Sequence, residues 1–341
     1  MCSKAMITFI FLGVFLATAT GVAGAAEYKL KLPLGLQEQA LYIPPDNPLT
    51  AEKISLGKQL YFDKRFSGDN TVACASCHNP RFGFTDGKPV STGILGQKGG
   101  RSAPTTVNRA FSKEQFWDGR AADLEAQAKG PIANPIEMGF THDELIKRLR
   151  AIKGYREQFK NVFGTEQFTI DHVAKAIAAF ERTILSGNSP FDRFEAGDKM
   201  ALSPPAQRGL ALFRGKANCF RCHSGFNSTD ESYHNIGVGM DKPKPDLGRF
   251  AVTKREEDRG AFKTPTLRDI ALTAPYFRDG SAKTLEEVVE FYNKGGIKNP
   301  QLSKEIKPLK LTAGEKRDLV EFLGALTGEM DLEVLAPELP K

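Results

Sequence analysis

The sequence predicts a mainly α-helical protein made of two related halves, with long irregular loops between its helices. Three observations lead to this prediction. Two short cysteine motifs each follow a helix-like segment, a pattern of residues after the first motif recurs after the second, and the alternation of apolar and polar residues that is typical of strands is scarce. With 341 residues, 40% of them apolar and 26% charged, the chain is long enough for two globular domains.

The N-terminus has the features of a secretory signal. Lys4 supplies a positive charge, residues 7–17 form an apolar run, and residues 23–25 offer a small-residue cleavage site. The run is shorter than the roughly 18–20 residues that span a bilayer, which argues against an uncleaved anchor. We expect a signal peptide over residues 1–25, a mature chain that begins near Ala26, and export to the periplasm.

Helix-start signals precede both cysteine motifs. Thr50 is a candidate N-cap for a helix over residues 49–62, and Ser203, followed by two prolines, is a candidate start for a helix before the second motif. Between the halves, residues 168–185 carry an apolar stripe at helical spacing, which predicts a linking helix. A further helix is expected to start after Thr141.

The segment that follows each cysteine motif is repeated. Thr106 lies 11 residues before Trp117, and Thr266 lies 11 residues before Phe277. In both copies a glycine then precedes a Leu-Glu pair by 5 residues. We therefore align Trp117 with Phe277 and expect the two halves to fold alike.

Every cysteine outside the predicted signal lies in one of two Cys-x-x-Cys-His motifs. Two thiols three positions apart can form thioethers to the two vinyl groups of one haem, and the adjacent histidine then faces the iron as its proximal ligand. A redox dithiol or a zinc site is the alternative for a single motif, but two such motifs in an exported chain favour two c-type haems. The expected haem-binding residues are Cys74, Cys77, His78, Cys219, Cys222 and His223.

We expect each half to form a domain around one covalently attached haem, over residues 26–195 and 196–341. The formal net charge of the chain is +6 at pH 7. The propionates of two haems would bring the loaded protein close to neutrality, so we expect no nucleic-acid partner.

The repeat allows the two haem environments to be compared. The residue 12 positions after the repeated glycine is Pro131 in the first half and Tyr292 in the second. If the halves fold alike, these residues lie over equivalent faces of the two haems, and tyrosine can bind iron whereas proline cannot. We therefore expect the first haem to be open to peroxide and the second to be closed by Tyr292.

Two polar residues flank Pro131. Glu137 could move a proton between the peroxide oxygens and Gln127 could hold the peroxide, as peroxide cleavage requires, although both could also be surface residues of a loop. Trp117 is the only tryptophan and could carry electrons between the two irons. A core aromatic is the more common use of tryptophan.

Together these features resemble the bacterial dihaem cytochrome c peroxidase family and its MauG-type relatives, which mature methylamine dehydrogenase. The resemblance covers nearly the whole mature chain. It implies two cytochrome c-like helical domains, a peroxide site at the first haem, and a relay at the second haem that accepts electrons from a small donor protein. It rests on the motifs at residues 74–78, 84–87, 115–120, 130–135, 246–250 and 264–280.

The resemblance also implies roles for individual residues. By position, Trp117 matches the inter-haem tryptophan, Gln127 the distal glutamine and Glu137 the catalytic glutamate. Thr273 and Pro275 match positions whose backbone carbonyls bind a calcium ion, a cation that favours oxygen ligands.

Three positions depart from the family pattern. Many members have a histidine 16 residues after the histidine of the first motif, which blocks the peroxide site until the relay haem is reduced. Here that position is Ile94, so we expect the first haem to be open in every redox state. The relay ligand is usually methionine in the peroxidases and tyrosine in MauG-type proteins; we expect Tyr292, with Met240 as the alternative. Ser102 stands where the family often has an asparagine that helps to bind calcium.

The expected function is the reduction of hydrogen peroxide to water with electrons from a small periplasmic cytochrome c or cupredoxin. Two alternatives stay open. A MauG-like enzyme would oxidise residues of a partner protein, whereas a purely electron-transferring dihaem cytochrome would leave Gln127 and Glu137 without a task. Dimerisation is common in the peroxidases, so a homodimer is also allowed. The remaining histidines, expected to be structural, are His142, His172 and His234.

Overall fold

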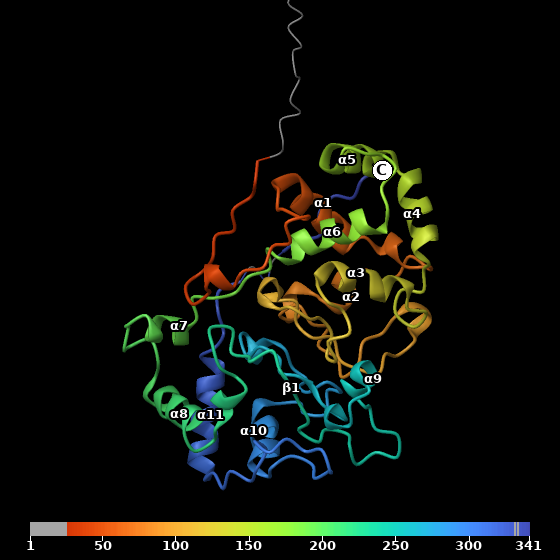
Figure 1. Cartoon of the computed structure of the whole chain (residues 1–341). Coiled ribbons are helices and arrows are strands. Elements are labelled where there is room, and N and C mark those ends of the chain that lie inside the picture. Colours follow the sequence, from red (N-terminus) through yellow and green to blue (C-terminus); the bar gives the residue numbers. More distant parts are fainter. Residues whose placement is uncertain (1–25, 331, 333) are drawn as a thin grey trace, which may run out of the picture.

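A computed structural model of the chain describes residues 26–330, 332 and 334–341, so the predicted signal peptide over residues 1–25 lies outside the described residues. Figure 1 shows helices α1 to α6 in one group and α8, α10 and α11 in a second, with long loops between them. The prediction of a mainly helical fold is confirmed. Among the described helices, none has the length and apolar character needed to cross a membrane.

Most regular structure in the described part of the chain is helical, and few strands interrupt the series of helices. The only strands in the described part are β1 and β2, which pair antiparallel with Tyr233 opposite Lys263. The helices are α1 (Ala51–Phe62), α2 (Cys74–Cys77), α3 (Leu124–Ala133), α4 (His142–Ala151), α5 (Lys153–Phe163), α6 (Ile170–Glu181), α7 (Pro190–Glu195), α8 (Pro204–Arg214), α9 (Phe250–Thr253), α10 (Leu285–Asn293) and α11 (Ala313–Gly324), and the strands are β1 (Tyr233–His234) and β2 (Phe262–Lys263).

The predicted helix starts are confirmed by their caps. The Thr50 hydroxyl accepts a hydrogen bond from the Lys53 amide at 3.2 Å, and the Ser203 hydroxyl accepts one from the Ala206 amide at 3.3 Å. Thr141 forms a capping box with Glu144 at the start of α4.

The linking helix α6 is shorter than the predicted range of residues 168–185, because its last residues bond elsewhere. The Asn108 amide donates to the Ile184 carbonyl, and the Ser186 amide donates to the Asn108 side chain, both at 2.9 Å. These bonds to a distant loop replace the next helical turn, so α6 ends at Glu181.

The backbone corrects the register of the internal repeat. Phe116 and Phe277 both have left-handed backbone, with φ of 66° and 64°. The bridge between Gln115 and Ala121 also recurs between Tyr276 and Ala282. The alignment of Trp117 with Phe277 was therefore wrong by one residue. The match of one aromatic residue to another hid this one-residue shift. The pairing of Pro131 with Tyr292 is counted from the repeated glycines, so it is unchanged.

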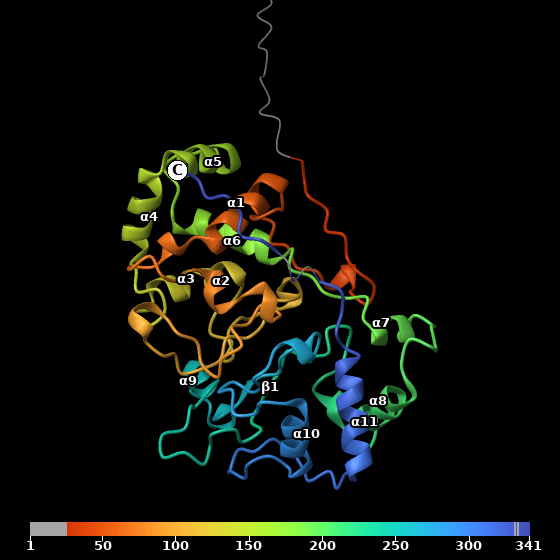
Figure 2. The ribbon, with the colours of Figure 1, turned by 180° about the vertical axis from the view of Figure 1, so that it is seen from behind.

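The two halves share one helix crossing. In each half, the helix that leads to the cysteine motif packs against a later helix of the same half, α1 on α6 and α8 on α11 (Figure 2). A glycine lies at each crossing: a Cβ atom would be 1.9 Å from the Ala176 carbonyl oxygen at Gly57 and 2.0 Å from the Asp318 carbonyl oxygen at Gly209. The two backbones touch at both positions, so no side chain fits there.

Each half has its own hydrophobic core. The first core gathers buried side chains of α1 and α3–α6, including Leu56 and Ile177, and the second gathers those of α8, α10 and α11, including Phe322. The C-terminal tail returns to the first core, where Val334 packs against it and Arg65 donates to the carbonyl of Pro340 at 3.1 Å. The two halves are therefore joined by both α6 and the tail.

We predict that Gly57→Ala destabilises the protein by about 1–3 kcal/mol, because the added methyl group must separate two touching helix backbones. Urea unfolding of the haem-loaded protein measures the loss. Gly324→Ala in α11 is the control, since a Cβ there meets no atom within 4 Å. That substitution should be neutral or stabilise by up to about 1 kcal/mol, as expected for alanine in a helix. Equal effects of the two variants would contradict the role given to the crossing.

Candidate haem sites

The first cysteine motif opens onto a cavity of about 420 Å³ that is lined by Cys74, Cys77 and His78. The Nδ1 atom of His78 lies 3.3 Å from the carbonyl oxygen of Phe84. A ring that donates from Nδ1 to this carbonyl keeps Nε2 unprotonated and available to a metal. Burial lowers the pKa of His78, which favours the neutral ring that iron requires.

The second motif has the same arrangement around a cavity of about 250 Å³. The Nδ1 atom of His223 lies 3.2 Å from the Ser228 carbonyl oxygen, and burial lowers the pKa of His223 to about 4. Apolar side chains of α8, α10 and α11 form much of the wall, among them Phe213, Val289 and Leu323. A cavity of this kind, with two thiols and a neutral imidazole at its edge, fits a c-type haem.

The first cavity also has buried polar atoms that lack partners. Among the described residues, neither the Thr106 hydroxyl nor one carboxylate oxygen of Glu181 has a hydrogen-bond partner, and both side chains line this cavity. Burial raises the pKa of Glu181 to about 8. Arg109 and Lys263 line both cavities; Arg109 supplies positive charge there, and burial lowers the pKa of Lys263 to about 7. These polar and cationic groups fit a cofactor that carries propionates.

Helix α3 and the turn after it bring the predicted peroxide-site residues together. Gln127 and Pro131 are one helical turn apart on α3, and both line the first cavity with Glu137. The Asn134 side chain donates a 2.7 Å hydrogen bond to Oε1 of Glu137. Burial raises the pKa of Glu137, while the nearby charge of Arg120 and the bond from Asn134 oppose this rise.

Trp117 lines both cavities and stands in the wall between them. Its indole N–H donates to the Ser102 carbonyl at 2.9 Å, and its own carbonyl accepts from the Lys263 amide at 2.8 Å. Arg249 donates to the two following carbonyls, of Asp118 and Gly119, both at 3.0 Å. The second half therefore holds the segment that carries the tryptophan of the first.

Tyr292 lines the second cavity together with His223, at the α10 position that corresponds to Pro131 on α3. Burial raises the pKa of its phenol, and the rings of Phe277 and Phe291 lie at 6.3 and 5.5 Å between centroids. Met240 lies outside this lining, with its sulfur 2.6 Å from where a Cβ of Gly260 would stand. The ligand role of Tyr292 stays a prediction.

Ile94 packs into the first core instead of lining the cavity. The side chain is 9% exposed, and its Cδ1 atom lies 2.3 Å from where a Cβ of Gly139 would stand. The Ile94 amide donates to the Glu137 carbonyl at 2.9 Å. This loop is thus bonded to the turn that carries the predicted catalytic carboxylate.

The predicted calcium residues lie at the edge of the second cavity, which both Thr273 and Pro275 line. Ser102 does not offer a free side chain there, because its hydroxyl donates to the Phe277 carbonyl at 3.0 Å. Calcium at this place stays a prediction.

Two of the other three histidines make ordinary structural contacts. His142 lies 2.9 Å from the Lys129 carbonyl through its Nε2 atom, and Nδ1 of His172 lies 3.0 Å from the Thr169 amide at the start of α6.

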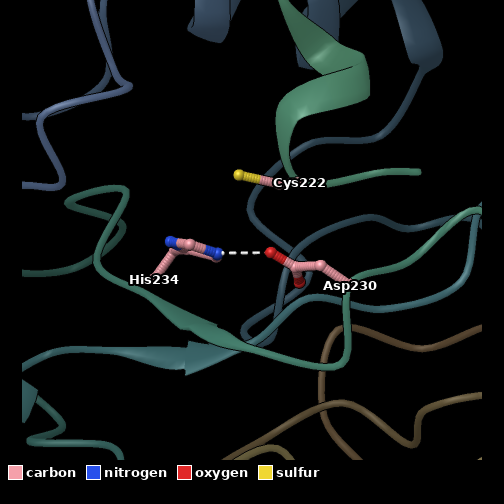
Figure 3. A group of neighbouring side chains, drawn as sticks. All are labelled: Cys222, Asp230 and His234. Carbon is pink, nitrogen blue, oxygen red and sulfur yellow. Dashed lines mark hydrogen bonds and ion pairs between the residues drawn. The ribbon is translucent and has the colours of Figure 1, made fainter.

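His234 lies at the second haem site. Its Nε2 atom is 2.8 Å from Asp230, and Cys222 faces the same pair (Figure 3). Because the motif commits Cys222 to a thioether, we assign no separate metal site to this group. Sequence patterns did not reveal the Asp230 contact or the bond from Asn134 to Glu137, since neither pair repeats or follows a helical face.

The comparisons with known proteins agree with this geometry. A family model described as "Di-haem cytochrome c peroxidase" matches residues 51–200. The chain is 43% identical to "Methylamine utilization protein MauG" of Methylorubrum extorquens, covering 95% of this chain and 92% of that protein. It is also 43% identical to "Cytochrome c551 peroxidase" of Nitrosomonas europaea, covering 85% of each. A solved MauG-like protein associated with microbial copper homeostasis superposes with a TM-score of 0.81 at 35% identity, over 89% of this chain and 96% of that one.

We predict that Asn134→Ala moves the acid limb of the pH–rate profile for peroxide reduction to higher pH. If Glu137 has the predicted role of proton acceptor, it must be ionised, and the rate then falls as the pH drops through its pKa. The Asn134 bond favours the ionised carboxylate, and its loss raises that pKa further.

Stopped-flow kinetics across the pH range measure the limb. Gln97→Ala is the control, because the Gln97 amide donates to the Pro135 carbonyl at 3.1 Å on the same turn without contacting the carboxylate. A limb that stays in place in Asn134→Ala, or that moves equally in both variants, would contradict the role of Asn134.

Proposed function

The chain belongs to the di-haem cytochrome c peroxidase family, and on that premise we propose that it is a periplasmic enzyme that reduces hydrogen peroxide to water. Its cofactors are two haems, one at each Cys-x-x-Cys-His motif. Bound there, the haems supply irons that exchange electrons and, where one face is open, accept peroxide. Each turnover consumes one peroxide, two electrons and two protons and yields two water molecules.

One observation carries this proposal: the two cavities present different side chains at equivalent helix positions. The cavity of His78 has Pro131 there, beside Gln127 and Glu137, and the cavity of His223 has Tyr292. Proline leaves a face of the first haem free, whereas a tyrosine can close the second. The first site is therefore the place for peroxide and the second the relay.

We assign to Glu137 the proton transfer that peroxide cleavage requires. Its Oε1 atom accepts the bond from Asn134, and its Oε2 atom has no hydrogen-bond partner among the described residues. We assign to Oε2 the transfer of a proton between the two peroxide oxygens, to the one that leaves as water. The amide of Gln127, one turn before Pro131, holds the peroxide in place.

Electrons from the relay cross to the first site through Trp117, because this ring borders both cavities. The donor is a small periplasmic cytochrome c or cupredoxin. Since Ile94 is buried in the first core and no histidine stands in its place, the first site accepts peroxide without prior reduction of the relay.

A second function is favoured by one observation. Tyr292, as a phenolate, lowers the potential of the relay haem and makes higher oxidation states easier to reach. Such an enzyme could oxidise residues of a partner protein, which is the MauG-like alternative. A MauG protein is among the relatives at 43% identity. A purely electron-transferring cytochrome is not favoured, because relatives are named as peroxidases.

We also propose the finer features that the resemblance implies. The chain forms two haem domains, over residues 26–195 and 196–341. The C-terminal tail belongs to the second range in sequence but packs on the first core. A calcium ion binds the backbone carbonyls of Thr273 and Pro275, neither of which accepts a hydrogen bond from another described residue. A homodimer stays a prediction.

We predict that Glu137→Gln lowers the rate of peroxide reduction by about 10²–10⁴-fold, the range expected for loss of a general acid–base group. The haem spectra should be nearly unchanged, because the amide has the same shape. The exposed Glu157→Gln in α5 is the control and should retain full activity. Undiminished turnover by Glu137→Gln would remove its assigned role.

We predict that Tyr292→Phe changes the optical and magnetic spectra of the second haem only, since the phenyl ring cannot bind iron. Met240→Leu is the matched control and should leave both haems unchanged. The opposite result, with the spectrum altered by Met240→Leu and not by Tyr292→Phe, would make Met240 the ligand.

A further inference from the structure

We propose that the mouth of the second haem cavity is a docking surface for a small acidic redox protein. We call it the lysine surface; its residues are Phe220, Arg221, Lys304, Lys307 and Lys310. The proposal rests on the proposed function, since it names the kind of donor that delivers electrons to the relay haem.

Positive charge is concentrated in one loop of the second half. Residues 294–310 contain five lysines and one acidic residue, Glu305, so this loop contributes +4 of the formal net charge of +6. The remaining chain is nearly balanced. All five lysines are exposed.

The loop lies directly against the second haem motif. Glu305, Ile306 and Lys307 line the same cavity as Cys219 and Cys222.

Side-chain contacts join the loop to the motif itself. Asn218 donates to Glu305 at 3.4 Å, and Arg221 lies 3.7 Å from the same carboxylate. The loop that carries the lysines is therefore bonded to the segment to which the haem would be attached.

An exposed aromatic ring lies in the haem motif, next to Arg221 in the sequence. Phe220 stands between the two cysteines of the motif and is 42% exposed. An apolar centre with a polar rim is the usual composition of a protein interface. The charged rim steers the partner, and close contact at Phe220 brings the partner's redox centre near the haem edge.

The lysines of the surface are free to meet a partner. Among the described residues, no carboxylate lies within ion-pair distance of Lys304, Lys307 or Lys310. Neighbouring cations differ: Lys216 pairs with Glu315 at 2.8 Å and Arg214 with Glu195 at 2.9 Å. Unpaired charge at the haem edge attracts an acidic protein at long range and repels a basic one.

An acidic protein fits the lysine surface better than an anionic membrane does. Clusters of four to eight lysines or arginines also attract anionic membranes, so the location of the charge is the deciding observation. Lys307 lines the cavity of the second haem motif, and Lys304 and Lys310 lie three residues to either side of it in the sequence. A redox partner explains why the lysines lie beside this cavity, whereas a lipid surface would not explain that position.

The test compares two charge-reversal variants of the haem-loaded enzyme. Lys304→Glu/Lys307→Glu/Lys310→Glu alters the lysine surface. Lys31→Glu/Lys64→Glu/Lys147→Glu, the control, makes the same charge change at exposed lysines that lie in the first half and outside both cavities. The probes are an acidic plastocyanin, a basic mitochondrial-type cytochrome c, and vesicles rich in phosphatidylglycerol.

The first readout is binding, measured by calorimetry at several salt concentrations. We expect the unaltered enzyme to bind plastocyanin with an affinity that falls as salt rises. The surface variant should bind at least tenfold more weakly, and the control within twofold of the unaltered enzyme. Equal loss in both variants, tighter binding of the basic cytochrome, or binding of vesicles in place of plastocyanin would overturn the proposal.

The second readout is peroxide turnover, which separates this proposal from the proposed function. With plastocyanin as donor, the surface variant should show a KM at least tenfold higher and little change in kcat. With a small uncharged hydroquinone as reductant, both variants should match the unaltered enzyme. Surface-dependent binding without any turnover would keep the docking surface and refute the peroxidase, whereas full turnover with identical plastocyanin KM values in both variants would refute the docking surface alone.

Discussion

The wall between the two cavities is the contact on which the rest of the site depends. Trp117 borders both cavities, and the carbonyls at residues 117–119 are held by the Lys263 amide and the Arg249 guanidinium of the second half. These bonds are made to backbone carbonyls of the segment that carries Trp117. They therefore fix the position of the indole whichever side chains surround it. Hydrogen bonds across the two halves therefore hold the wall that separates the two cavities.

The same fold is used twice, and small sequence differences make the two copies unequal. Both halves cross two helices at a glycine, Gly57 or Gly209, and both place a third helix over the cavity. On that third helix, Pro131 lines one cavity and Tyr292 the other, and under the proposed function this difference decides which cavity accepts peroxide. Under the proposed function, the exchange at this position and the polar residues Gln127 and Glu137 of the first copy separate peroxide chemistry from electron supply.

Much of this arrangement was predictable from sequence, and the missing parts have a common cause. Helix caps at Thr50 and Ser203, the two haem motifs and the convergence of Gln127, Pro131 and Glu137 follow from local spacing. No helix face or repeat connects the groups that the bonds from Asn134 and Lys263 join, and the lysine surface needs the three-dimensional placement of its loop beside Cys222. The register error at Trp117 arose because two adjacent aromatic residues, Phe116 and Trp117, compete for one match.

The most direct test of this account is the spin state of the two irons in the fully oxidised protein, followed by electron paramagnetic resonance before and after peroxide is added. An open first haem and a tyrosine-bound second haem predict one high-spin and one low-spin ferric signal, with no prior reduction needed for peroxide to change the high-spin signal. Two low-spin signals that do not respond to peroxide would contradict the inequality of the two sites.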